Sequence, residues 1–253
     1  MDLTGRVAVV VGGTSGLGRV IALGLSEAGA DVVATGRRQE LVDEVSAAVQ
    51  SLGRATLNQT VNVADRKSID ELRDAVVKKF GHVDILLNAA GRTKRTPTID
   101  LSEEEWQSTL ETNVTGMLRC CQSFYEPLVA SKRGRIINIA SLTSFVSFFE
   151  VTAYAASKGA VLALTRSLAV EWARHGIVVN AIAPGVFRTD LNATLLDGTQ
   201  RGRELLMRTP MGRFGRLDEV VGAAVLLASD ASSFITGQCI TVDGGFLASG
   251  VNS

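Results

Sequence analysis

Proline, cysteine and any surplus of one charge are scarce in this 253-residue chain. It contains only four prolines and three cysteines, and its 26 basic residues are offset by 26 acidic ones. Nucleic acid or an anionic membrane would favour a basic surplus, so we expect neither as a partner. The 25 glycines, combined with so few prolines, indicate tight turns in a regular fold rather than disorder.

The cysteines and the apolar runs indicate where the protein works. Cys120, Cys121 and Cys239 lack the spacing of a metal site, so we expect no metal and interpret them as core or interface thiols in a reducing compartment. The apolar run Val7–Val11 is too short to span a bilayer, and the first residues show no signal-peptide pattern. We therefore expect a cytoplasmic protein.

Apolar strands alternate with amphipathic helices along the whole chain. Val7–Val11 is a continuous β-branched run that stops at glycine, as a strand buried on both faces would. Further strands are expected at residues 31–35, 55–63, 84–88, 134–140, 177–183 and 239–242. Between them the pattern predicts helices at residues 19–28, 39–52, 67–80, 103–130, 152–175 and 217–228. This order predicts a single α/β domain spanning residues 1–253, a doubly wound Rossmann fold with a mostly parallel, seven-stranded sheet.

A glycine-rich stretch, Gly12-x-x-x-Gly16-x-Gly18, lies between the first strand and the first helix. A helix amino terminus presents unpaired backbone N–H groups that suit a pyrophosphate, and glycine lets the ligand approach the backbone. The alternative is a tight turn that binds no ligand. We expect a dinucleotide here, with contacts from Gly12, Thr14, Ser15, Gly16, Leu17 and Gly18.

The residues after the second strand, Thr35-Gly36-Arg37-Arg38, contain no acid. A carboxylate at this place usually binds the ribose 2′-hydroxyl of NAD, whereas arginine accommodates the 2′-phosphate of NADP. Because Ser15 is not basic, the cofactor prediction depends on Arg37 and Arg38, which could instead be solvated charges at the start of a helix. We predict that NADP(H) is preferred and that NAD(H) is possible.

Tyr154-Ala-Ala-Ser-Lys158 places a phenol and an ammonium on one face of a predicted helix. A nearby ammonium favours the phenolate, so we expect the pKa of Tyr154 to fall below its reference of about 10. A phenol that titrates nearer to neutral pH can exchange a proton with an alcohol oxygen. Taken alone, this spacing is common enough to be an accident.

The motifs together resemble the short-chain dehydrogenase/reductase family in order and spacing. The matching pieces are Gly12-x-x-x-Gly16-x-Gly18, Asn88-Ala-Ala-Gly91, Asn113, Ser141, Tyr154-x-x-x-Lys158 and Pro184-Gly185. The resemblance implies that Tyr154 is the general acid/base and that Ser141 binds the substrate oxygen. It also implies that Lys158 lowers the pKa of Tyr154 and binds the nicotinamide ribose, and that Asn113 kinks the long helix and holds a relay water.

The same resemblance implies a second set of cofactor contacts. These are Asn62, Val63, Asn88, Ala89, Ala90, Gly91, Tyr154, Lys158, Pro184, Gly185, Phe187 and Thr189. Two residues depart from the family pattern: Val11 stands where threonine is usual, and Asn62 stands where aspartate is usual. We expect cofactor binding to survive both departures. Val11 removes a hydroxyl contact but not the phosphate-binding backbone, and the amide oxygen of Asn62 can still accept from the adenine amino group.

Several segments resemble gluconate 5-dehydrogenases and related sugar-acid dehydrogenases. They are Ser141-Leu-Thr-Ser144, Arg208–Gly215 and Val242–Gly245. Four cations lie in predicted loops near the expected site: Arg92, Lys94, Arg95 and Arg188. They would suit a carboxylate-bearing substrate, although charges on a solvated loop explain them equally well. We predict substrate contacts from Ser141, Tyr154 and Arg95. A pocket wall of Phe145, Phe148 and Phe149 would also suit a less polar carbonyl.

The predicted function is reversible hydride transfer between the nicotinamide cofactor and a small-molecule hydroxyl/carbonyl substrate, such as gluconate/5-ketogluconate. The alternatives are a 3-oxoacyl-carrier-protein reductase and a non-catalytic dinucleotide-binding regulator. Residues 190–211 are expected to form a lid over the substrate. Small residues line the predicted helix 152–175, and the long helix carries Met117, Leu118, Cys120 and Cys121. In the family these two helices form a dimer interface, so we expect a homotetramer.

Overall fold

The computed structural model describes residues 1–188 and 193–252. In this part of the chain, six parallel strands form one sheet in the order β2-β1-β3-β4-β5-β6. Their bounds are β1 (Val7–Val11), β2 (Asp31–Thr35), β3 (Ile85–Asn88), β4 (Arg135–Ile139), β5 (Val178–Pro184) and β6 (Cys239–Val242). The strand order reverses between β1 and β3, and in open α/β sheets ligands bind beyond the carboxyl ends of the strands at such a point.

The strands are apolar along their length because helices cover both faces of the sheet. In β1, Val7, Val9 and Val11 enter one hydrophobic cluster, whereas Ala8 and Val10 enter the other. Successive side chains of a strand point to opposite faces, so both faces need apolar residues. A continuous run of valine and alanine is therefore what this central strand requires.

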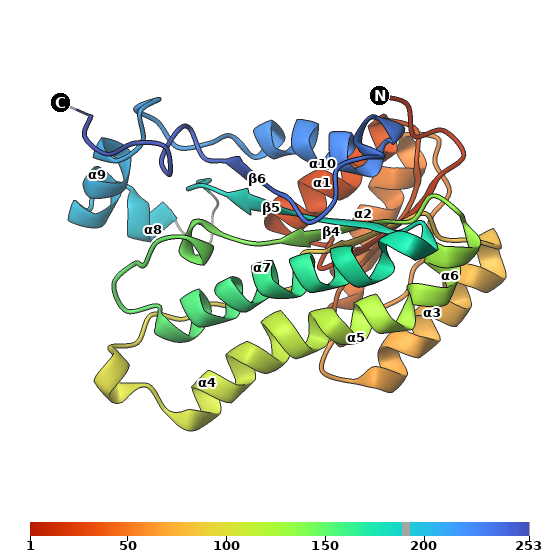
Figure 1. Cartoon of the computed structure of the whole chain (residues 1–253), viewed down its shortest axis with the longest axis horizontal. Coiled ribbons are helices and arrows are strands. Elements are labelled where there is room, and N and C mark those ends of the chain that lie inside the picture. Colours follow the sequence, from red (N-terminus) through yellow and green to blue (C-terminus); the bar gives the residue numbers. More distant parts are fainter. Residues whose placement is uncertain (189–192, 253) are drawn as a thin grey trace.

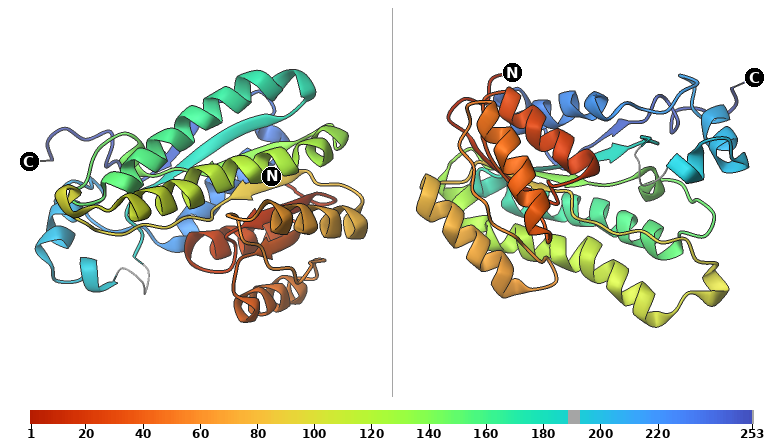
Figure 2. Two further views of the ribbon diagram at one scale, coloured as in Figure 1. Left: turned by 90° about the horizontal axis from the view of Figure 1, so that it is seen from below. Right: turned by 180° about the vertical axis from the view of Figure 1, so that it is seen from behind.

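Two helical layers enclose the sheet (Figures 1 and 2). One layer holds α1 (Gly16–Glu27), α2 (Gln39–Ser51) and α10 (Val221–Ala228). The other holds α3 (Arg66–Phe80), α5 (Gly116–Ser123) and α7 (Thr152–Trp172). The predicted doubly wound α/β fold of one domain is confirmed. None of the helices described here is both long and apolar enough to cross a membrane.

The strand expected at residues 55–63 is wrong, which leaves six strands where we predicted seven. This segment bonds the backbone of the β2 edge only near its two ends: Val32 N donates to Ala55 O at 3.1 Å, and Val61 N donates to Gly36 O at 2.9 Å. Its middle, residues 58–60, is polar and carries no apolar face to bury. It therefore runs beside β2 without a continuous ladder.

The helix expected at residues 103–130 is divided into several parts. It begins as α4 (Glu103–Leu110), passes through a π-helical turn at Glu111–Thr115, and continues as α5 and α6 (Tyr125–Ala130). Ser102 caps it by accepting from the backbone N–H of Glu105 at 3.2 Å. The carboxylate of Glu105 accepts from Lys94 and Thr96, which ties the start of this helix to the loop after β3.

The segment beyond β5 lies at the carboxyl ends of the strands. It contains α8 (Ala193–Leu196) and α9 (Gln200–Met207), both at the left in Figure 1. The predicted lid covers residues 190–211, of which 190–192 lie outside the described residues. Within the described remainder these two short helices are joined and followed by turns.

The three cysteines are free thiols. Cys120 and Cys121 are fully buried in the core, and Cys239 is partly buried. Burial raises the pKa of Cys121 to about 12 and that of Cys239 to about 11, so both thiols stay protonated and unreactive near neutral pH. The prediction that they are core thiols is confirmed for Cys120 and Cys121.

Candidate active site

The four predicted catalytic residues come from three elements near the carboxyl end of β4. Ser141 follows β4 directly and begins a short 3₁₀ turn at Leu142–Ser144. Tyr154 and Lys158 lie in the first turns of α7, and Asn113 lies in the π-helical turn. The hydroxyl of Ser144 donates to the backbone oxygen of Lys158 at 2.8 Å, which ties the 3₁₀ turn to α7. The fold thus places residues that are far apart in sequence around one point.

Lys158 is buried beneath this point. Its ammonium donates to the backbone oxygen of Ile139, the last residue of β4, at 2.6 Å. The Nζ atom lies 5.6 Å from the ring centroid of Tyr154. Only 4% of Lys158 is exposed, and this burial lowers the pKa of its ammonium from 10.5 to about 8. The Lys158 ammonium therefore lies beside Tyr154, and its hydrogen-bond acceptor is the backbone carbonyl of Ile139 rather than an acidic side chain.

The expectation for Tyr154 is wrong in its direction. Burial raises the pKa of the phenol above its ordinary value of 10, because the charged phenolate loses more hydration than the neutral phenol. A hydrogen bond with Ser141 lowers the pKa and offsets part of that effect. The proximity of Lys158, which motivated the expectation, does not outweigh burial. Tyr154 in this structure is a neutral phenol at neutral pH.

Asn113 fixes the loop that follows β3. Its Nδ2 donates to Arg92 O at 3.0 Å and to Ser157 Oγ at 2.9 Å, while its Oδ1 accepts from Arg92 N at 2.8 Å. The Ser157 hydroxyl in turn donates to the backbone oxygen of Tyr154 at 2.7 Å. Because the π-helical turn directs this fully buried amide inward, Asn113 connects the loop at Arg92 to the first turn of α7. A π-helical turn thus interrupts the long helix at Asn113, the residue where the family resemblance implies a kink.

The glycine-rich stretch forms a close-packed cradle at the start of α1. A Cβ on Gly12 would lie 2.4 Å from Ala90 N, and one on Gly18 would lie 2.1 Å from Gly12 O. Gly16 has a φ of +53° and open space beside it. Ser15 precedes the helix without capping it through its side chain, and the first turn contains no acid. Unpaired N–H groups without a competing carboxylate fit the pyrophosphate of a dinucleotide.

The residues expected at the adenosine end are on the surface near the carboxyl end of β2. Arg37 and Arg38 are exposed, and within the described residues neither is paired with an acid. Thr14 is buried against Gly36, where a Cβ would lie 2.7 Å from Thr14 Oγ1. Asn62 is exposed, and its side-chain oxygen accepts from Ala64 N at 3.2 Å. The two arginines are thus available to an anionic group.

The predicted residues after β3 and β5 lie at the same edge of the sheet. Asn88 donates from Nδ2 to Asn138 Oδ1 at 2.9 Å, in a buried polar contact between β3 and β4. Gly185 is packed so closely that a Cβ would lie 2.5 Å from the Cα of Asp243. Phe187 is buried and pairs with Gly215 in a short parallel bridge. The predicted contact of Thr189 lies outside the described residues.

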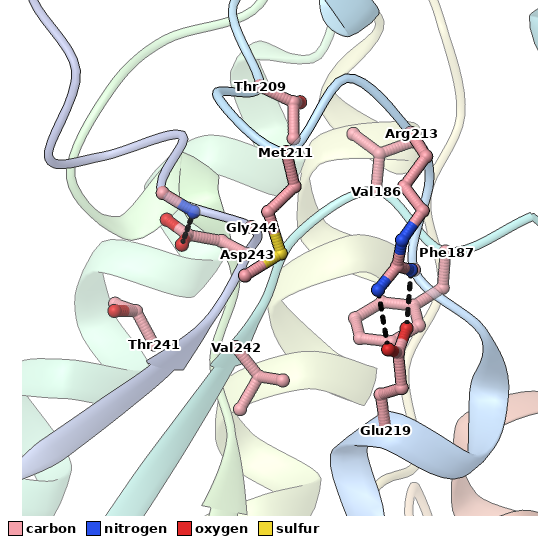
Figure 3. A pocket seen from close by; sticks show the side chains of 12 residues that line it. Val186, Phe187, Thr209, Met211, Arg213, Glu219, Thr241, Val242, Asp243 and Gly244 are labelled. Atoms are coloured by element: carbon pink, nitrogen blue, oxygen red, sulfur yellow. Dashed lines mark hydrogen bonds and ion pairs between the residues drawn. The ribbon is translucent and has the colours of Figure 1, made fainter.

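A cavity of about 380 Å³ opens beyond the ends of β5 and β6 (Figure 3). Phe187 forms part of its floor, and Met211 and Asp243 lie on the opposite side. The cation at its rim is already neutralised, since Arg213 makes two bonds to Glu219 at 2.7 and 2.8 Å. None of the four catalytic residues lines this cavity, so we place the chemistry at Tyr154 and not here.

The loop cations predicted to bind the substrate are already engaged. Arg95 forms an ion pair with Glu150 at 2.5 Å, and Lys94 forms one with Glu105 at 2.7 Å. Arg188 forms one with Asp197 at 2.7 Å, and Arg92 donates to Ser108. The backbone N–H of Thr96 donates to Glu150 O, which keeps Arg95 close to the segment before Tyr154. The positive charge of Arg95 is compensated by the carboxylate of Glu150.

Of the three predicted wall aromatics, only Phe148 packs inward. It meets Phe246 edge to face, with ring centroids 5.8 Å apart, whereas Phe145 and Phe149 are exposed. The guanidinium of Arg201 on α9 lies 5.9 Å from the Phe148 ring. Sequence reasoning missed Arg201 and Phe246, because neither lies in a motif and only the tertiary fold brings them to Phe148.

Comparison with known proteins agrees with this geometry. A family model described as Enoyl-(Acyl carrier protein) reductase matches residues 11–247. The chain belongs to the short-chain dehydrogenase/reductase family. It is therefore an oxidoreductase that acts on alcohol and carbonyl groups.

Similar proteins of this family span nearly the whole chain. A 2-dehydro-3-deoxy-D-gluconate 5-dehydrogenase of Escherichia coli (strain K12) is 41% identical over 250 residues, which is 98% of this chain and 97% of that protein. A D-threitol dehydrogenase of Mycolicibacterium smegmatis is 37% identical over 96% of this chain and 94% of its own. A solved gluconate 5-dehydrogenase of Burkholderia cenocepacia J2315, in complex with NADP and tartrate, has a TM-score of 0.94 and 36% identity over 98% of both chains.

Proposed function

We propose that this short-chain dehydrogenase/reductase interconverts hydroxyl and carbonyl groups of sugar acids, such as gluconate and 5-ketogluconate, with NADP(H). The observation that carries the proposal is the convergence of Ser141, Tyr154 and Lys158, with Asn113 behind them, beside an open helix amino terminus. Similarity to sugar-acid dehydrogenases over 98% of the chain supports the substrate class.

The chain's own residues handle the proton. When bound, the nicotinamide cofactor supplies or accepts the hydride. Tyr154, kept neutral by burial, donates its phenolic proton to the substrate oxygen as a carbonyl is reduced. Ser141 Oγ accepts from the backbone N–H of Thr143 at 3.1 Å, so its hydroxyl can donate to the same substrate oxygen in place of its hydrogen bond with Tyr154. The Lys158 ammonium stabilises negative charge that develops on Tyr154.

The cofactor preference is proposed from the end of β2. Arg37 and Arg38 are exposed cations at the place where a ribose 2′-phosphate would lie, and the loop contains no acid to bind a 2′-hydroxyl. Replacing both by alanine should lower kcat/KM for NADPH by at least about tenfold and leave kcat/KM for NADH nearly unchanged. Equal losses with both cofactors, or a wild-type preference for NADH, would contradict this assignment.

A second candidate is a neutral polyol as the substrate. It is favoured by the similarity to a D-threitol dehydrogenase and by the pairing of Arg95 with Glu150, which removes one expected carboxylate contact. Initial rates with 5-keto-D-gluconate, D-gluconate, D-threitol and a 3-oxoacyl thioester, followed by NADPH absorbance, separate the candidates. A higher kcat/KM for either sugar acid than for D-threitol and the thioester supports the proposal, and the reverse order refutes it.

We also propose a homotetramer in which α7 lies at an interface between copies. A Cβ added to Gly159 would meet no atom within 4 Å, and Ala156 and Ala163 on the same helix are exposed. Val170, further along α7, is 83% exposed. Of the four residues named on the long helix, Met117, Cys120 and Cys121 belong to the chain's own core, and Leu118 is partly exposed.

A further inference from the structure

Arg201 differs from Arg95, Arg188 and Arg213 in how its charge is balanced, and it shares with Arg208, which lies over Phe246, the lack of an ion pair among the described residues. It lies in the first turn of α9, and its Nη1 donates to the backbone oxygen of Phe149 at 3.4 Å. Arg95, Arg188 and Arg213 each have a carboxylate oxygen within 2.7 Å. Among the described residues, Arg201 has none within ion-pair distance.

The guanidinium of Arg201 has more donors than acceptors. A guanidinium carries five N–H donors, and here one long bond to a carbonyl is its protein partner in the described part of the chain. It is partly buried against the face of Phe148, where its centre lies 5.9 Å from the ring centroid. That burial, together with the nearby charge of Arg95, lowers the pKa of Arg201, whereas Glu150 and Glu204 raise it. A guanidinium with unused donors binds a carboxylate strongly, because the carboxylate can accept two parallel hydrogen bonds at once.

The segment under Arg201 leads directly into the catalytic tyrosine. Phe148, Phe149 and Glu150 lie in the chain between Ser141 and Tyr154, and Glu150 is four residues before the tyrosine. Glu150 has a φ of +64°, a conformation that costs energy for a residue with a side chain. In that conformation its carboxylate binds Arg95 and its backbone oxygen accepts from Thr96 N at 2.9 Å.

Glu150 therefore pairs with only one of two neighbouring cations, Arg95 and not Arg201. Its carboxylate neutralises Arg95 at 2.5 Å, while Arg201 keeps its charge and its donors. Glu204, the other acid near Arg201, accepts from Gln200 Nε2 at 2.9 Å and makes no ion pair with Arg201 among the described residues, so the guanidinium keeps donors for a further acceptor. A further carboxylate would complete the pairing.

We propose that Arg201 binds the carboxylate of the substrate and so selects sugar acids over neutral polyols. This inference rests on the proposed function, since it names the residue that recognises the acid end of that substrate. In an open-chain sugar acid the carboxylate lies several carbons away from the carbonyl that is reduced. The acid end can thus lie under Arg201, against Phe148, while the reacting oxygen lies at Ser141 and Tyr154. A polyol offers hydroxyls to Arg201 and gains less, because bonds to a charged acceptor are stronger.

The test compares Arg201→Gln, Arg201→Lys and Arg203→Gln, each with NADPH. Arg203 is a matched control on the same helix, since its side chain is exposed and donates to Gly198 O at 3.0 Å. For Arg201→Gln we expect KM for 5-keto-D-gluconate to rise roughly ten- to a hundredfold, with a much smaller change in kcat. KM for a neutral ketose should stay within about twofold. Arg201→Lys should restore part of the loss, because it keeps the charge but not the paired donors.

A second measurement keeps this result distinct from the substrate assignment. Glutarate is a dicarboxylate that has no ketone or alcohol group to react. It is tested as an inhibitor of the reduction of whichever substrate the wild type reduces best. Its inhibition constant should rise in Arg201→Gln and stay unchanged in Arg203→Gln. If the wild type reduces only neutral substrates, the proposed function fails, and a selective loss of glutarate inhibition would still support the role of Arg201. Equal effects on acid and neutral ligands, or no effect on glutarate, would overturn the inference.

Discussion

At the scale of single residues, the active site depends on burial more than on pairwise attraction. Tyr154 and Lys158 are four residues apart on α7, and burial acts on them in opposite directions. It raises the pKa of the phenol and lowers that of the ammonium, because each group loses hydration in its charged form. The proton that reduction requires is thus held on Tyr154 across neutral pH.

This protonation state predicts different pH dependences for the two directions of the reaction. Oxidation of an alcohol needs the deprotonated phenol, so its kcat/KM should rise with pH through the alkaline range. Reduction of a carbonyl needs the neutral phenol, so its kcat/KM should be flat near neutral pH and fall only at alkaline pH. Initial rates measured in both directions across the pH range check this. An oxidation rate that does not change from neutral to alkaline pH would contradict it.

Tyr154→Phe removes the acid without enlarging the site. We expect kcat to fall by about 10²- to 10⁴-fold, the usual contribution of a positioned acid or base. NADPH binding, measured by fluorescence, should be retained, because the glycine cradle at α1 is untouched. Unchanged turnover would exclude Tyr154 as the proton donor.

Lys158 makes a testable contribution to stability. Its pKa is about 8 in the folded chain and 10.5 ordinarily, so between these values the unfolded chain holds a proton that the folded chain has lost. Stability must then rise with pH in this window, by up to about 1.4 kcal/mol per pH unit relative to a chain without the lysine. Urea unfolding of wild type and Lys158→Met from pH 7 to 10 measures the difference. It should be constant below pH 8 and shift in favour of the wild type above it.

At the scale of elements, the π-helical turn positions the site through one amide. It turns Asn113 inward, and this side chain holds both backbone groups of Arg92 and the hydroxyl of Ser157. A π-helical turn contains one more residue than an α-helical turn. A regular α-helix through Glu111–Thr115 would therefore direct a different side chain toward Arg92 and Ser157.

Asn113→Ala should therefore destabilise the fold and slow the reaction together. It removes the partner of the part-buried backbone N–H and C=O of Arg92, at a cost of up to about 1–3 kcal/mol for each group that water cannot reach. Thr112→Ala is the matched control, because the Thr112 hydroxyl only donates back to Ser108 O within the helix and should cost less than about 0.5 kcal/mol. Urea unfolding and kcat are measured for both variants. Equal effects of the two substitutions would argue against this role.

At the scale of the whole molecule, the small residues on α7 predict association between copies. Ala163→Arg places a long charged side chain on that face and should convert the proposed tetramer to smaller species. Lys67→Ala, on an exposed turn of α3, should leave the assembly unchanged. Sedimentation velocity at micromolar concentration measures both. A monomeric wild type would refute the tetramer, and a tetrameric Ala163→Arg would place the interface elsewhere.

The sequence by itself determined the order of elements and the identity of the chemical groups. Apolar runs between glycines fixed β1 and β2 to the residue, because buried parallel strands need them. Motif residues such as Ser141 and Tyr154 were evident from their type and spacing. Local patterns failed at residues 55–63, because this segment lies beside β2 but bonds its backbone only near the two ends of the segment.

Only the tertiary structure decided the electrostatics of the site. Sequence spacing predicted a lowered pKa for Tyr154, but the pKa depends on burial, which is set by packing from several elements at once. It also predicted Arg95 as a substrate contact, whereas folding brings Glu150 to Arg95 and brings Arg201 over Phe148. Charge compensation depends on which side chains meet across 50 or more residues of chain. No local pattern contains that information.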